Sequence, residues 1–130
     1  MRRARKPTRR GIAAVELAVC LPVLVLLVMG TIELSSFIFL KQGLTAAAYE
    51  GARTGIRADA TDTTARASVN RVLAGRRFTG ASTDIDPGVG VSRGTKLTVS
   101  VSAPSSANRI IFPRFVRGVT VTGQATMVKE

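Results

Sequence analysis

The chain has 130 residues, enough for one modest domain, with 19 lysines and arginines, 8 acidic residues and a net charge of +11. It has no histidine and one cysteine, Cys20, so imidazole-based metal sites, catalysis by a histidine base and an intrachain disulfide are all excluded. An enzyme would have only scattered carboxylates to work with. The sequence therefore predicts a protein that is not an enzyme, with no catalytic residues, no metal site and no cofactor.

The positive charge is concentrated at the N-terminus, where the first ten positions hold six basic residues and no acidic one. These six are Arg2, Arg3, Arg5, Lys6, Arg9 and Arg10. The rest of the chain has 13 basic against 8 acidic residues, an ordinary excess. Its arginines have no aromatic stacking platform beside them, which argues against nucleic acid as a partner. The tail instead indicates a membrane topology signal.

An apolar run of 21 residues, from Ile12 to Ile32, follows this tail and carries one charge, Glu16. A helix of that length covers about 32 Å, which matches the hydrocarbon core of a bilayer. Pro22 lies inside the run, as membrane helices tolerate, usually with a kink. Glu33 is expected at the outer boundary. Residues 34–40 are then expected to continue the helix as an amphipathic extension.

The positive-inside rule predicts that the tail lies in the cytoplasm and the remainder outside. Residues 1–40 have a second interpretation, a secretory signal peptide cleaved near residues 46–48. Its apolar region would be far longer than the usual 7–15 residues, so a permanent single-pass anchor is favoured.

Gly11 ends the basic tail, and Glu16 follows at the head of the apolar run. This arrangement resembles the prepilin-peptidase signal of type IV pilins, which implies cleavage between Gly11 and Ile12. A carboxylate within a bilayer is costly unless it is paired. Glu16 of one subunit could therefore pair with the new amine of Ile12 in a neighbour. Alternatively, Glu16 lies only about 6 Å inside the boundary and interacts with Arg10 or water.

Residues 9–55 resemble the N-terminal region of TadE-like proteins, the minor pseudopilins of tight-adherence (Flp-type) pilus systems. The resemblance is carried by Gly11, residues 14–16, the Leu21-Pro22 pair, Gly30 with Glu33, and the motif AAYEGAR at residues 47–53, which includes Glu50, Gly51, Ala52 and Arg53. Leu17 departs from it, because the family typically has an aromatic residue there.

The resemblance implies a protein anchored in the bacterial inner membrane, with a periplasmic or extracellular head, that assists pilus assembly without enzymatic activity. The implied partners are other pilins or pseudopilins, pilus-assembly platform proteins and a prepilin peptidase. The alternative is an uncleaved, signal-anchored envelope protein that uses the same module as a structural part outside a pilus system.

Residues 41–57 place small apolar residues at offsets of three and four, which predicts one smooth helix face. The face comprises Leu44, Ala47, Ala48, Gly51, Ala52, Gly55 and Ile56. Small side chains allow close backbone approach. The face therefore packs on a neighbouring subunit's helix, on this chain's own sheet, or on both. Glu50 can reach Arg53 on an exposed face.

Asp59 or Thr61 is predicted to cap a short second helix that ends near Ala74. Alternating apolar residues then predict strands over 96–103 and 119–127, and a third strand is expected over 85–92. The loop Ile110–Val116 has three possible roles: docking on a partner, touching headgroups, or capping the sheet edge.

The predicted fold is α+β, with a long N-terminal helix (transmembrane, then periplasmic), a short second helix and a small antiparallel sheet of about three strands. The expected organisation is a basic cytoplasmic leader over 1–11, a transmembrane helix with its amphipathic extension over 12–40, and an extracytoplasmic α+β head over 41–130.

Overall fold

The computed structural model describes residues 9–108 and 118–129. Its elements are α1 (Arg9–Gly55), α2 (Asp62–Gly75), β1 (Ser82–Asp86), β2 (Lys96–Pro104), the short 3-10 helix η1 (Ser105–Ala107) and β3 (Thr120–Val128). The strands form one antiparallel sheet in the order β1-β2-β3. The predicted α+β fold is confirmed. The tail residues before 9 and the loop Ile110–Val116 lie outside the described residues.

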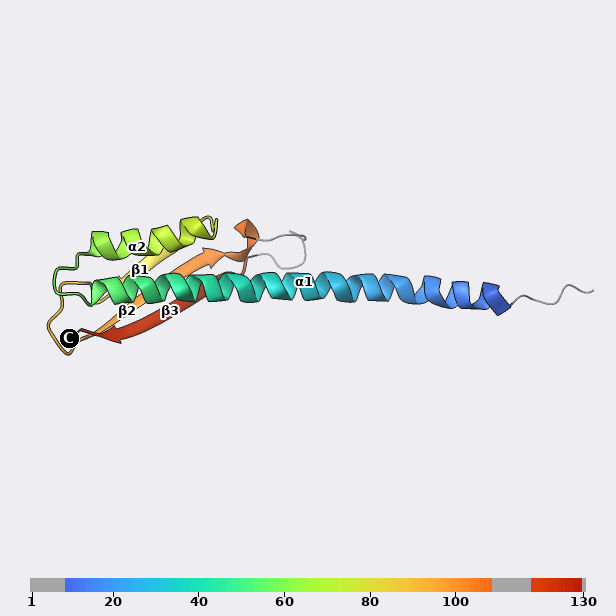
Figure 1. Cartoon of the computed structure of the whole chain (residues 1–130), viewed down its shortest axis with the longest axis horizontal. Helices are drawn as coiled ribbons and strands as arrows, with labels where there is room; N and C mark the ends of the chain where they lie inside the picture. Colours follow the sequence, from blue (N-terminus) through green and yellow to red (C-terminus); the bar gives the residue numbers. More distant parts are fainter. Residues whose placement is uncertain (1–8, 109–117, 130) are drawn as a thin grey trace, which may run out of the picture.

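Helix α1 is a single element of 47 residues that continues through Pro22 and across the expected boundary between residues 40 and 41. Figure 1 shows its N-terminal half extending away from the head, while its C-terminal half lies against α2 and the sheet. The large apolar side chains from Ile12 to Val28 are 46% to 70% exposed. Leu40, by contrast, is 3% exposed and belongs to the core of the head. The helix is long and apolar enough to cross a membrane.

The sheet has one apolar face and one polar face, as the alternation in β2 predicted. The apolar face of β2 is fully buried against the helices and consists of Leu97, Val99, Val101 and Ala103. On the opposite face, hydroxyl groups pair across the strands: Thr98 lies 2.9 Å from Thr126, and Ser102 lies 2.8 Å from Ser82. The helices therefore cover one face, and solvent meets the other.

The strand expected over 85–92 is placed wrongly. It is β1, which runs from Ser82 to Asp86 and pairs with β2 so that Ile85 lies opposite Val99. Ile85 is the one buried residue of this strand, so no apolar alternation marks it in the sequence. Pro87 has no backbone N–H to donate to a ladder, which ends the strand at the preceding residue.

The second helix begins where the sequence predicted, with Thr61 rather than Asp59 as its N-cap. The Thr61 and Thr64 hydroxyls accept from each other's backbone N–H groups at 3.3 and 2.9 Å, a reciprocal capping box. The helix ends at Gly75 and turns its buried residues toward α1. These are Ala65, Ser68, Val69 and Leu73. Val72, next to Leu73, is only half-buried.

Candidate functional site

The proposed processing segment lies at the exposed beginning of α1. Gly11 is followed by Ile12, whose side chain is 58% exposed, and a Cβ atom added at Gly11 would meet nothing within 4 Å. Glu16 is exposed one turn further along, and no ion pair among the described residues involves it. The bond after Gly11 and the Glu16 carboxylate are therefore both accessible on the surface of the isolated chain.

The expected membrane boundary coincides with the place where α1 meets the head. Glu33 is half-buried there and lines a small pocket with Ser36 of α1 and with Ser105 and Asn108 from η1 and the residue after it. Six residues beyond Glu33, Phe39 packs edge-on against Phe78 at 6.0 Å between ring centroids. The head thus begins within two turns of the end of the apolar run.

The small-residue face of α1 is buried inside the chain's own head. Six of its seven members are buried and Ile56 is half-buried; the six are Leu44, Ala47, Ala48, Gly51, Ala52 and Gly55. A Cβ atom on Gly51 would lie 2.5 Å from Val69 of α2, and one on Gly55 would lie 2.6 Å from Leu97 of β2. Of the two expected uses of this face, the structure shows packing within the chain. The apolar N-terminal half of α1, which precedes the head, is the part of the helix that stays exposed.

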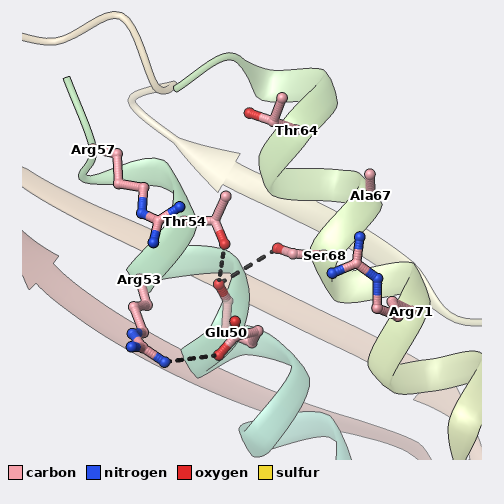
Figure 2. Close-up of a pocket in the computed structure, with 8 residues that line it drawn as sticks. All are labelled: Glu50, Arg53, Thr54, Arg57, Thr64, Ala67, Ser68 and Arg71. Atoms are coloured by element: carbon pink, nitrogen blue, oxygen red, sulfur yellow. Dashed lines mark hydrogen bonds and ion pairs between the residues drawn. The ribbon is translucent and has the colours of Figure 1, made fainter. Parts of the chain in front are cut away.

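Glu50 and Arg53, on an adjacent face of α1, line a groove between α1 and α2 (Figure 2). We call it the arginine groove, and its volume is about 360 Å³. It is lined by Glu50, Arg53, Thr54 and Arg57 from α1 and the turn after it, and by Thr64, Ala67, Ser68 and Arg71 from α2.

The backbone carbonyl of Glu50 accepts hydrogen bonds from both walls of the arginine groove. The Glu50 carbonyl oxygen accepts from the Thr54 hydroxyl at 2.9 Å and from the Ser68 hydroxyl of α2 at 3.4 Å. Ser68 also donates to the Ala65 carbonyl at 2.7 Å. The single proton of the Ser68 hydroxyl is therefore shared between the Ala65 carbonyl of its own helix and the longer contact to Glu50 of α1.

The groove carries three guanidinium groups and one carboxylate. Arg53 lies 3.8 Å from Glu50, and this is the single ion pair within the described parts of the chain. Arg57 and Arg71 therefore have no carboxylate partner among the described residues. Arg57 and Arg71 are 14 positions apart in the sequence, which gives no signal that they line the same groove. Only the folded helix pair brings them to one groove.

The described residues contain no group of three or more histidine, cysteine, aspartate or glutamate side chains that could hold a metal ion. The chemistry available in the groove is therefore charge pairing and hydrogen bonding.

Comparison with protein families supports the sequence resemblance. Residues 11–53 match the family described as TadE-like protein. The match covers about a third of the chain, which we call the TadE-like segment. TadE-like proteins are a structural family associated with Tad pili. No curated protein and no solved structure matches the chain.

The TadE-like segment coincides with most of α1. It begins at Gly11, includes both the exposed apolar half and the buried small-residue face, and ends at Arg53 in the arginine groove. Arg57 and Arg71 lie outside the matched residues, as do α2 and the whole sheet. The TadE-like segment therefore contributes Glu50 and Arg53 to the groove, and residues after the matched segment contribute the rest of its lining.

Proposed function

We propose that this chain is a membrane-anchored pseudopilin or accessory protein in the assembly of a tight-adherence (Flp-type IV) pilus or a related secretion system. The observation that carries the proposal is the form of the TadE-like segment. One uninterrupted helix joins an exposed apolar half to a half that is buried in the head. Such a helix anchors the chain and offers its apolar surface to neighbouring subunits, while the head stays folded around the other end.

In the proposed arrangement, residues 1–11 are a cytoplasmic leader, the bilayer surrounds the first part of the span 12–40, and the head faces the periplasm or the exterior. The exposed apolar side chains from Ile12 to Val28 support the anchor, and the six basic residues before them support the orientation. Because Leu40 is part of the core, the head packs around α1 from about that residue, which is the last residue of the expected span 12–40.

Subunit association is proposed to occur through the exposed half of α1. Cleavage after Gly11 would create an ammonium group at Ile12, and Glu16 lies about 6 Å further along the helix axis. In a bilayer, an unpaired carboxylate is expensive. Pairing of Glu16 with the Ile12 amine of a neighbour would remove that cost and set the axial offset between adjacent helices. The buried small-residue face would take no part in this contact.

The direct test is the N-terminus of the chain in an envelope fraction from cells that contain an active prepilin peptidase. Mass spectrometry is expected to find a mature chain that starts at Ile12, and Gly11→Val is expected to leave the precursor uncut. Gly30→Val is the matched control, because both glycines lie in α1 with open space around them. If wild-type chain is found only at full length beside an active peptidase, the chain is instead an uncleaved, signal-anchored structural protein.

A further inference from the structure

We propose that the arginine groove binds an acidic segment of a partner protein, whose carboxylates are held by Arg57 and Arg71. The two guanidinium groups approach the groove from opposite walls, Arg57 from the turn after α1 and Arg71 from α2 (Figure 2). A planar guanidinium presents paired N–H donors that match the two oxygens of a carboxylate. The residues on these walls thus have the chemistry to bind more than one carboxylate at once.

The charges inside the groove favour an anion. Glu50 is the one acidic side chain that lines it, and Arg53 already lies 3.8 Å from that carboxylate. Two positive charges are left over, on Arg57 and Arg71. Both side chains are exposed, so they are hydrated in the free chain and available to a ligand. An incoming carboxylate would replace water at charge-assisted hydrogen bonds.

The position of the groove along α1 argues against a lipid headgroup as its ligand. Arg53 follows Ile12 by 41 residues in the same helix, an axial distance of about 62 Å at 1.5 Å per residue. A bilayer has a hydrocarbon core of about 30 Å and reaches about 40–45 Å with its headgroups. If Ile12 lies at one edge of the core, the groove lies roughly 20 Å or more beyond the opposite headgroups. Phospholipid phosphates are therefore out of reach.

A second copy of this chain is a poor occupant, because it offers no acidic run. No two of its 8 acidic residues are adjacent in the sequence. Asp62 is engaged as an acceptor for the Val89 N–H at 2.9 Å. Asp84 and Asp86 alternate with buried Ile85 on the open face of β1, so they form a pair fixed on a strand and not an acidic run. The preferred occupant is thus a different protein with clustered carboxylates, whether or not the bond after Gly11 is cleaved.

The proposal is tested with the full chain in nanodiscs of zwitterionic lipid, using fluorescent hexaglutamate as the probe and hexaglutamine as its neutral counterpart. We expect anisotropy to show binding of hexaglutamate that weakens as salt is added. The double variant Arg57→Gln/Arg71→Gln is expected to bind at least about ten-fold more weakly. Glu50→Gln removes the competing carboxylate and is expected to tighten binding.

The matched control is Arg93→Gln/Lys96→Gln, which removes the same charge from exposed positions outside the groove. It is expected to leave binding within about two-fold of wild type, since distant exposed charges are screened. Equal weakening by both double variants would overturn the proposal in favour of general charge attraction. Self-association of the chain that depends on Arg57 and Arg71 would overturn it in favour of a second copy. Circular dichroism confirms that each variant is folded.

Discussion

Gly123 of β3 lies directly against the backbone of Thr45 in α1. A Cβ atom built on Gly123 would lie 2.3 Å from the Thr45 amide nitrogen and 2.5 Å from the carbonyl carbon of Leu44. Backbone atoms of a helix cannot rotate away as a side chain can, so only glycine fits at this position. Close packing of β3 on the TadE-like segment therefore depends on a residue far outside the family match.

The first prediction concerns this contact. Gly123→Ala is expected to destabilise the head by about 2–3 kcal/mol, because the added methyl group would force the strand and the helix apart. Calorimetry of the full chain in detergent measures this loss of stability as a lower midpoint temperature of thermal unfolding. Gly90→Ala is the control: a Cβ there meets nothing within 4 Å and its φ is not positive. Equal stability of the two variants would contradict the described packing of β3 on α1.

The second prediction concerns the centre of the core. Leu97 is 0% exposed, and its side chain fills the space beside Gly55 of α1. Leu97→Ala is expected to cost about 3 kcal/mol through lost burial and the cavity left behind. Val119→Ala, at a position that is 39% exposed, is expected to cost much less. Calorimetry measures the stability of both variants. Similar losses of stability in Leu97→Ala and Val119→Ala would show that β2 does not face the helices.

The third prediction concerns the N-terminus of α2. Thr61→Ala removes the side chain that accepts from the Thr64 N–H at 3.3 Å, and is expected to cost about 1 kcal/mol. Thr61→Ser keeps the hydroxyl and is expected to stay near wild type. Hydrogen exchange measured by mass spectrometry is expected to show faster opening of the first turn of α2 in the alanine variant only. Unchanged protection in that variant would argue against the cap.

The fourth prediction follows from the proposed function. Glu16→Gln keeps the shape of the side chain and removes its charge, so the processed N-terminus is expected to form as before. Pairing with a neighbour's amine is expected to be lost. Cross-linking between the exposed halves of α1, followed by copurification with partner pilins, measures the association. Wild-type association of this variant would show that the Glu16 charge is not what holds neighbouring helices together.

The sequence predicted well those elements in which apolar residues recur at a regular spacing, because such spacing marks the one face that is buried. Alternation over Leu97–Ala103 identified β2, because every second side chain is in the core. Spacing of three and four over Leu44–Gly55 identified the buried face of α1 for the same reason. Periodicity did not say what would cover that face. A stripe of small residues looks alike whether it packs on its own sheet or on another subunit.

The features that the sequence did not locate depend on contacts between distant segments. β1 lies at an edge of the sheet and buries only Ile85, so its position follows from pairing with β2 and not from its own pattern. The arginine groove was missed for a related reason. Glu50 and Arg53 were recognised as a local pair, but Arg57 and Arg71 share a groove only because α2 folds back along α1.

The continuity of α1 fixes the direction in which the head faces. Each residue inserted between Ile32 and Leu40 would rotate the head by about 100° about the helix axis and displace it by about 1.5 Å. Seven inserted residues would restore nearly the original direction about 10 Å further out. The angle between Glu16 and the arginine groove is thus set by the number of helical residues between them. A partner that contacts both must match that angle as well as the distance.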